Sequence, residues 1–316
     1  MAVPLKGPRT AAPSQVVPQS RRPFWTSYRR DQLAGYLFIT PQLAGIIVFV
    51  LTPLVLVVYY SFHEWNPLAG TFHGVGVDNY RALADDPKLP NVLRATAYFS
   101  VSLVVLNLAL ALALAVLLNQ KLRGTTVFRT FFFSPVIVSI VAWTVVWGFL
   151  LQKNGGINAF LHLIGIQGPN WLRGNTTAML SLIVAQLFKN VGLNMVLFLA
   201  ALQGVPRALY EAATIDGAGR WRQFRRITIP LISPTILLAL IITFAGSLQA
   251  FAQIAVLTQG GPEGSTTVLV YYIYQQAFQF NHFGYGATLS VLLFVIVFVL
   301  TAIQWQMRKK WVFHES

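Results

Sequence analysis

The sequence of 316 residues contains no cysteine and few charged residues. Without thiols it forms no disulfide, no thiolate metal site and no cysteine nucleophile. Asp, Glu, Lys and Arg make up 10% of the chain and hydrophobic residues 55%, whereas average chains carry about 25% charged residues. The phosphate-binding pattern Gly-x-x-x-x-Gly-Lys-Ser/Thr is also missing, so the chain has no ATP site of that kind. This composition excludes an ordinary soluble globule and indicates a membrane protein.

Acidic residues are especially scarce. The chain has 9 Asp and Glu against 23 Lys and Arg, which gives a formal net charge of +14. In a soluble protein such an excess would indicate nucleic-acid binding. In a membrane protein, basic residues collect in cytoplasmic loops, and we therefore expect no nucleic-acid partner.

Long apolar runs predict six membrane-spanning helices. A helix needs about 20 mostly apolar residues to cross the hydrocarbon core of a bilayer. Such runs occupy residues 33–60, 95–119, 131–151, 177–202, 235–257 and 285–306. Residues 1–32 hold five prolines and six basic residues and are predicted to be a disordered basic cytoplasmic tail. Residues 33–310 then form the six-span transmembrane domain, and residues 311–316 a C-terminal cytoplasmic tail.

The distribution of basic residues predicts the orientation. Seventeen Lys and Arg fall in the two tails and in the loops after the second and fourth spans, and five fall in the other loops. Because basic loops remain in the cytoplasm, both termini are predicted to be cytoplasmic. Lys189, the remaining basic residue, lies inside the fourth span.

The loop between the fourth and fifth spans, residues 203–232, carries the most informative pattern. Pro206 suits the first turn of a helix, and Gly217 suits the left-handed residue that ends one. The loop is therefore predicted to form two short helices around a turn. Leu209, Ala212 and Ala213 lie on one face of the first helix at i, i+3 and i+4, where small side chains let another protein approach closely.

Six residues of this loop stand at the spacing Glu-Ala-Ala, three residues, Gly, nine residues, Ile, one residue, Leu-Pro, with Ile229 in place of Leu: Glu211, Ala212, Ala213, Gly217, Ile227 and Pro230. In this the chain resembles the permease subunits of binding-protein-dependent ABC importers. The resemblance implies an all-α membrane protein with the type I ABC importer permease fold. It also implies that the loop is a coupling helix that docks on a separate ATPase. Glu211 would be its charged anchor, and Asp216 belongs to the same contact.

Four further segments resemble the carbohydrate-type permeases: Gly-Val-Gly-Val-Asp-Asn-Tyr at 74–80, Leu-Thr-Gln-Gly-Gly-Pro at 257–262, Tyr-Gln-Gln-Ala-Phe at 274–278 and Phe-Gly-Tyr-Gly at 283–286. The resemblance implies import of a mono-, di- or oligosaccharide delivered by an external substrate-binding protein. The implied partners are a second related permease subunit and two copies of a cytoplasmic ABC ATPase, which bind ATP and Mg. The chain itself would be non-catalytic, without a bound cofactor or metal, in a bacterial cell membrane.

Polar residues inside the predicted spans indicate a transport path, because polar groups are costly in hydrocarbon. Gln186, Lys189, Asn190 and Asn194 lie on one helical stripe of the fourth span. Amides and hydroxyls both donate and accept hydrogen bonds, as sugar hydroxyls require. The resemblance places the central binding positions of sugar permeases on six residues: Gln186, Lys189, Asn190, Ser139, Thr243 and Ser247.

Several alternatives remain at this point. Amides on these helices can also hold neighbouring helices together, and Lys189 can bind an anionic substrate, snorkel or pair with another helix. The same importer type could carry sn-glycerol-3-phosphate or a related glycerophosphodiester. An ion-driven secondary transporter usually shows a carboxylate inside the membrane, and none falls in a predicted span. A membrane-embedded enzyme needs a catalytic constellation, and the five histidines lack metal-ligand spacing.

Overall fold

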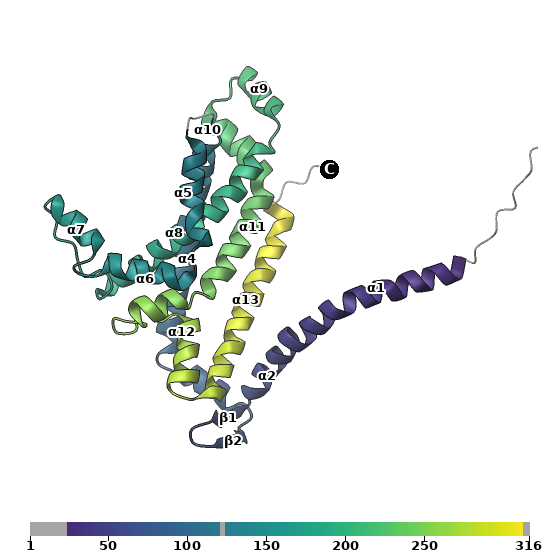
Figure 1. The fold of residues 1–316 in the computed structure, drawn as a ribbon, viewed down its shortest axis with the longest axis vertical. Coiled ribbons are helices and arrows are strands. Elements are labelled where there is room, and N and C mark those ends of the chain that lie inside the picture. Colours follow the sequence, from purple (N-terminus) through teal and green to yellow (C-terminus); the bar gives the residue numbers. More distant parts are fainter. Residues whose placement is uncertain (1–23, 121–123, 312–316) are drawn as a thin grey trace, which may run out of the picture. The chain divides into compact units, whose positions relative to one another are not determined.

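The computed structural model describes residues 24–120 and 124–311 (Figure 1). Its contacts divide the chain into two units, between Val55 and Leu56. The first unit contains α1 (Phe24–Ile46), the π-helical turn η1 (Ile47–Leu51) and the start of α2 (Thr52–Tyr60). Phe38 and Phe49 are 85% and 79% exposed on this helix. Large apolar side chains on an unburied helix suit contact with lipid.

The second unit is a helical bundle with a small β-hairpin. After the end of α2 it comprises β1 (His63–Asn66), β2 (Thr71–Gly74), α3 (Asp78–Asp85), α4 (Leu89–Leu118), α5 (Thr125–Ile137), α6 (Ile140–Leu151), α7 (Gly156–Leu163), α8 (Asn175–Gln203), α9 (Arg207–Ile215), α10 (Arg220–Gln223), η2 (Phe224–Thr228), α11 (Ile229–Leu248), η3 (Ile254–Thr258), α12 (Leu269–Tyr274), η4 (Gln275–Gln279) and α13 (Phe283–Trp311). The strands pair antiparallel, with Trp65 opposite Phe72. The hairpin and α9 lie at opposite ends of this unit (Figure 1).

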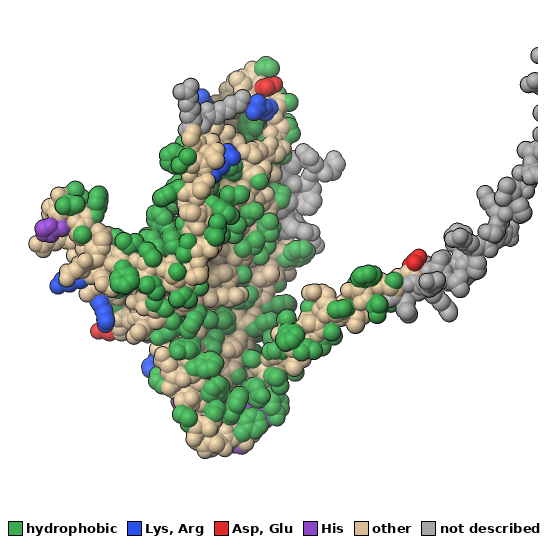
Figure 2. Space-filling view, in the orientation of Figure 1, with side chains coloured by type: hydrophobic (Ala, Val, Ile, Leu, Met, Phe, Trp, Pro, Cys, Tyr) green, Lys and Arg blue, Asp and Glu red, His purple; other side chains and the backbone are tan. Residues whose placement is uncertain are grey.

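Four predicted spans are confirmed as continuous apolar helices. Helices long and apolar enough to cross a membrane cover Ala34–Tyr60, Leu89–Leu118, Asn175–Gln203 and Phe283–Met307. They correspond to the first, second, fourth and sixth predicted spans. Figure 2 shows hydrophobic side chains spread along the sides of the bundle, as a surface that faces lipid requires.

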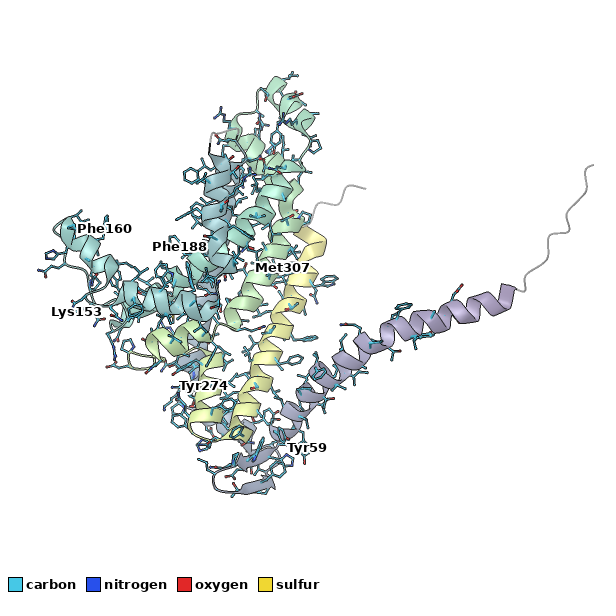
Figure 3. The ribbon with its side chains drawn as sticks, viewed as in Figure 1. Tyr59, Lys153, Phe160, Phe188, Tyr274 and Met307 are labelled. Atoms are coloured by element: carbon cyan, nitrogen blue, oxygen red, sulfur yellow. The ribbon has the colours of Figure 1, made fainter. Side chains whose placement is uncertain are left out.

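The third predicted span, residues 131–151, is not one straight helix. The segments Thr125–Ile137 and Ile140–Leu163 meet at a bend of 106°. Pro135 removes a backbone donor near the end of α5, and the Ser139 hydroxyl caps α6 by accepting a hydrogen bond from the N–H of Ala142 at 3.2 Å. α6 therefore turns away from α5 and packs against η3 and α8, and α7 continues beyond it. Figure 3 labels Lys153 and Phe160 in this region.

The fifth predicted span, residues 235–257, is displaced along the chain. The helical run begins at Arg220 and ends at Leu248. Pro230 lies inside this run, directly after the π-helical turn η2, where the regular hydrogen-bond pattern is already interrupted. Beyond the helix, Ala250 and Ile254 pack in a buried apolar cluster of the protein. Their apolar character thus serves protein packing, which hydropathy does not distinguish from burial in lipid.

The predicted tails also differ from the structure. α1 begins at Phe24, so residues 24–32 are helical rather than part of a disordered tail. The sequence has no proline between Phe24 and Thr40 to interrupt the helix. At the other end, α13 reaches Trp311. The predictions for residues 1–23 and 312–316 lie outside the described residues.

α8 is the central helix of the second unit, and α4, α5 and α11 pack against it. Their contact is a buried apolar cluster that includes Ala111 and Ala115 of α4, Val191 and Phe198 of α8 and Ala239 of α11. Small alanine side chains let the backbones of neighbouring helices approach closely in a membrane. α8 therefore holds the bundle together and leads directly to α9.

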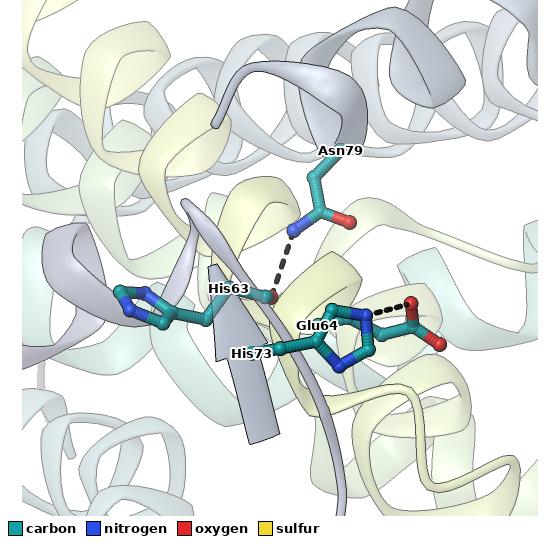
Figure 4. A network of polar contacts seen from close by, with 4 residues as sticks. All are labelled: His63, Glu64, His73 and Asn79. Atoms are coloured by element: carbon teal, nitrogen blue, oxygen red, sulfur yellow. Dashed lines mark hydrogen bonds and ion pairs between the residues drawn. The ribbon is translucent and has the colours of Figure 1, made fainter. Parts of the chain in front are cut away.

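Two segments that resemble carbohydrate-type permeases meet at the hairpin end. The amide of Asn79, from 74–80, donates to the Ser61 carbonyl at 2.9 Å. It also donates to the His63 carbonyl at 3.0 Å, the bond drawn in Figure 4. Gly284, from 283–286, lies so close that a Cβ there would overlap the His63 carbonyl oxygen. Glycine is thus required at this helix–strand contact. Beside it, Glu64 and His73 approach to 3.2 Å on the surface.

Asp86 ties the loop before α4 to α12 and α13. Its Oδ2 accepts hydrogen bonds from the hydroxyls of Tyr272 at 2.7 Å and Tyr285 at 2.6 Å. Burial would raise the pKa of Asp86, but these hydrogen bonds and those from the backbone of Lys88 and Leu89 lower it below the usual carboxyl value. Burial, followed by the contact with Asp86, raises the pKa of Tyr272 to about 12. The cluster therefore favours a carboxylate held by two neutral phenols.

We expect Asp86→Ala to lower the free energy of unfolding by about 2 kcal/mol at pH 7, because the hydroxyls of the buried Tyr272 and the half-buried Tyr285 lose a charged acceptor. The folded pKa of Asp86 is depressed, so the difference from wild type is full above about pH 4 and shrinks as the pH falls through the folded value. Thermal unfolding in detergent at several pH values measures it. Asp85→Ala changes an exposed neighbour and is the matched control. An equal loss in both variants would contradict the role of the cluster.

Candidate coupling surface and transport path

The loop between α8 and α11 forms the two predicted short helices. α9 ends at Ile215 and α10 begins at Arg220. Gly217 lies between them with φ of +75°, the left-handed conformation that the sequence predicts. α9 occupies the tip of the second unit (Figure 1), so its outer face is open to another protein.

Four polar side chains that the sequence analysis missed fix the angle between α9 and the following helix. The hydroxyls of Tyr210 and Thr228 share a hydrogen bond of 2.9 Å. The Gln223 amide donates to the Thr214 hydroxyl at 3.0 Å and to the Ala218 carbonyl at 2.9 Å. Polar side chains next to a turn give only a weak sequence signal for such a contact, since they are common on any loop. With these bonds, α9 is attached firmly to the start of the α10–α11 helical run.

The seven predicted coupling residues divide into an exposed and an anchored group. Glu211, Ala212, Asp216 and Gly217 are exposed. Ala213 is half-buried, and Ile227 and Pro230 are half-buried in the helix that follows, where Ile227 packs against the main apolar cluster. Only the first group is therefore free to contact a partner. The second group connects that surface to the membrane helices.

Three of the predicted substrate residues bond to other parts of the protein. Gln253 donates to the Gln186 side chain, which joins α8 to the segment after α11. The Ser247 hydroxyl donates to the Phe244 carbonyl of its own helix at 2.7 Å. Thr243 accepts a hydrogen bond from Asn194 at 2.8 Å. Each of these three side chains is buried.

Asn194 also links a third helix. Its amide donates to Asn107 of α4 at 2.5 Å, so one cluster joins α4, α8 and α11. Asn107 is fully buried, and the sequence analysis did not select it. Its signal was a single amide in the middle of an apolar run, which is costly in hydrocarbon unless paired. The predicted stripe on α8 thus contributes to helix association.

The remaining candidates differ in what they contact. Lys189 is 9% exposed, and its ammonium donates to the carbonyls of Pro135, Val136 and Val138. Ser139 is exposed and adjoins Val138, so the structure brings Lys189 and the Ser139 segment together. Asn190 is half-buried, and within residues 24–120 and 124–311 no hydrogen bond involves its side chain. Asn190 is therefore the candidate that is most available to a ligand.

Comparisons with known proteins agree with this architecture. A profile of the family described as binding-protein-dependent transport system inner membrane component matches residues 107–310. The chain is 37% identical over 276 residues to the lactose transport system permease protein LacF of Rhizobium radiobacter, covering 85% of this chain and 92% of that protein. It is 34% identical over 274 residues to the sn-glycerol-3-phosphate transport system permease protein UgpA of Yersinia enterocolitica, covering 86% and 92%.

A solved structure shares the fold. A chain from the crystal structure of a bacterial alginate ABC transporter in complex with an alginate pentasaccharide-bound periplasmic protein matches with a TM-score of 0.79 and 23% identity, covering 92% of this chain and 98% of that chain. The helical bundle and its exposed loop thus define a multi-pass membrane transport subunit. The chain belongs to the family of inner-membrane components of binding-protein-dependent transport systems. The expected family and the ABC importer permease fold are both confirmed.

We expect Gly217→Ala to loosen the coupling loop, because an L side chain at φ of +75° costs about 1 kcal/mol. Local opening should then rise about fivefold and expose Arg220 and Arg222 to trypsin. The rate of tryptic cleavage in the folded protein measures this. Gly219→Ala is the matched control, because Gly219 has an ordinary φ of −66° and equally open surroundings. Equal cleavage rates in the two variants would show that the left-handed turn is unimportant.

Proposed function

We propose that this chain is the permease subunit of an ATP-driven importer and forms half of the transmembrane path for a carbohydrate. The observation that carries the proposal is the exposed Glu-Ala-Ala surface at the tip of a bundle of the importer permease family. A second related permease subunit would supply the other half of the path. Two copies of a cytoplasmic ABC ATPase would bind ATP and Mg, and an external binding protein would deliver the substrate.

The geometry supports transmission of a movement from α9 to the membrane helices. α9 is joined to α8 by residues 204–206 and to the next helical run by the Tyr210–Thr228 hydrogen bond. Leu202 before α9 and Ile232 in α11 belong to the same buried cluster. A partner that shifts α9 would therefore tilt α8 and α11 together. These are the two helices that carry most of the polar candidates.

Neutral hydrogen-bonding groups favour a carbohydrate over an anionic substrate. The candidates besides Lys189 are amides and hydroxyls, which pair with sugar hydroxyls. Lys189 would have to leave three carbonyls in order to bind an sn-glycerol-3-phosphate or a glycerophosphodiester. The relatives with lactose, multiple sugar and starch degradation products in their names support the same choice. The described helices that are long enough to span a membrane contain no Asp or Glu, which disfavours an ion-driven transporter.

The proposed location is a bacterial cell membrane with both termini in the cytoplasm. The loop 203–232 then faces the cytoplasm and the β1–β2 hairpin faces outward. This orientation is the one that the distribution of basic residues along the sequence predicts. It also places the exposed coupling surface on the side where ATP is available.

Affinity purification from the native host in mild detergent tests the assembly. We expect the wild-type chain to recover a second six-span permease and an ATPase with a phosphate loop. Glu211→Lys should reduce the recovered ATPase at least about tenfold, because a reversed charge disrupts a charged contact, while the second permease is retained. Glu64→Lys, an exposed acid at the opposite end, should have no effect. A chain that purifies alone and transports in liposomes without ATP would refute the importer.

The substrate path is tested by Asn190→Leu. Loss of the amide should raise the KM for the transported sugar about 5- to 30-fold, which corresponds to one or two hydrogen bonds, and should leave complex assembly intact. Uptake assays with the reconstituted complex measure KM and Vmax. Asn194→Leu is the contrasting variant, since its amide bonds to neighbouring helices, and it should lower the melting temperature instead. An unchanged KM in Asn190→Leu would assign that residue to helix packing.

A further inference from the structure

The bend in the third span leaves backbone groups that a straight helix would satisfy internally. In a continuous helix the carbonyls of Pro135, Val136 and Val138 would accept hydrogen bonds from N–H groups four residues later. The bend after Ile137 removes these partners. Inside a bilayer there is no water to replace them, so another part of the protein must supply the donors.

Lys189 supplies these donors from the neighbouring helix α8. Its Nζ lies 2.5 Å from the Pro135 oxygen and 3.3 Å from the Val136 oxygen, and it also donates to the Val138 oxygen. An ammonium group has three N–H donors, and three carbonyls of the bend use them. A positive charge beside the carbonyl end of a helix is also favourable. The three carbonyls stabilise the buried charge, and the charge stabilises the bend.

α8 holds both sides of the bend. On the α6 side, the indole of Trp143 donates to the Ala185 carbonyl at 2.9 Å, and the Lys189 ammonium lies 5.9 Å from the Trp143 ring, within the range of a cation–π contact. On the α5 side, Gly192 lies so close that a Cβ there would overlap the Phe132 carbonyl oxygen. One face of α8 therefore fixes α5, the bend and the first turn of α6.

We propose that Lys189 is a positioning residue that latches the third span in its bent form, and that it is not a contact for the transported molecule. With all three donors engaged, the ammonium has none left for a substrate in this conformation. Opening of the latch would let α6, and α7 with it, change its angle to α5 at the bend. Only three residues separate α8 from α9. Movement of the coupling loop therefore acts on α8, the helix that carries Lys189. The link to the coupling loop rests on the proposed function. The role of Lys189 in holding the bend does not.

A pair of spin labels tests the latch directly, and the absence of native cysteines allows specific labelling. Phe128→Cys on α5 and Phe149→Cys on α6 change exposed residues on the two sides of the bend. Their backbones would be about 31 Å apart along a straight helix and roughly 19 Å apart across the observed bend. Pulsed electron paramagnetic resonance on the purified full-length protein in lipid nanodiscs, with whichever subunits copurify, measures this distance. We expect the short distance with Lys189 and a longer population in Lys189→Met.

Control variants distinguish a role of Lys189 in holding the bend from a general role in stability and from a contact with the substrate. Lys189→Arg keeps a cationic donor and should restore the short distance, and Lys153→Met, an exposed lysine after α6, should not change it. In uptake assays Lys189→Met should lower Vmax at least about fivefold while KM changes less than about twofold. If Lys189→Met does not assemble, Lys189→Gln, which keeps a polar side chain but has no charge and only two donors, should still lengthen part of the distribution.

Two results would overturn the proposal. The first is an unchanged distance in Lys189→Met, or in Lys189→Gln where Lys189→Met does not assemble. The second is a rise in KM with an unchanged Vmax, which would assign Lys189 to the substrate. The distance measurement does not depend on which substrate is carried or on the presence of an ATPase, so its failure is distinct from failure of the proposed function.

Discussion

The structure depends on one constraint, which is that hydrocarbon offers no hydrogen bonds to backbone or side-chain polar groups. Continuous helices meet this constraint largely by themselves, and five of the described segments that are long enough to cross a membrane are continuous. Where the chain departs from a straight helix, another element must supply the missing partners. At the bend after α5, the ammonium of Lys189 takes this role. The same rule explains why the buried Asn107 and Asn194 are found in contact across two helices.

This constraint makes α8 the central element of the second unit. Its polar stripe, which reads in the sequence as a binding surface, is largely occupied by other protein groups. Gln186 meets Gln253, Lys189 meets the bend and Asn194 meets α4 and α11. Polar residues in a membrane helix therefore serve two purposes that composition cannot separate. The contacts separate them, because an amide already paired with a neighbouring helix has less capacity for a ligand than the amide of Asn190, which has no hydrogen-bond partner among the described residues.

The sequence was sufficient to predict those parts of the fold that depend on neighbouring residues along the chain. Apolar length located four of the spans, and the positions of Pro206 and Gly217 located the two helices of the coupling loop. It was insufficient at Val138 and Ser139, because the residues on both sides of the bend are equally apolar and the donor that permits the bend lies about 50 residues away. The Asp86 cluster was missed for the same reason, since Tyr272 and Tyr285 reach it from distant segments.

The occupied stripe also limits how the proposed importer can recognise a sugar. A sugar presents several hydroxyls, and each needs a partner when it leaves water. Within the described part of this chain, Asn190 and Ser139 are the predicted positions that are neither buried nor bonded to another helix. Two such groups are too few to replace the hydration of a disaccharide. If the path carries a carbohydrate, most of its polar contacts must come from the second permease subunit, so substrate choice would be a property of the pair rather than of either half.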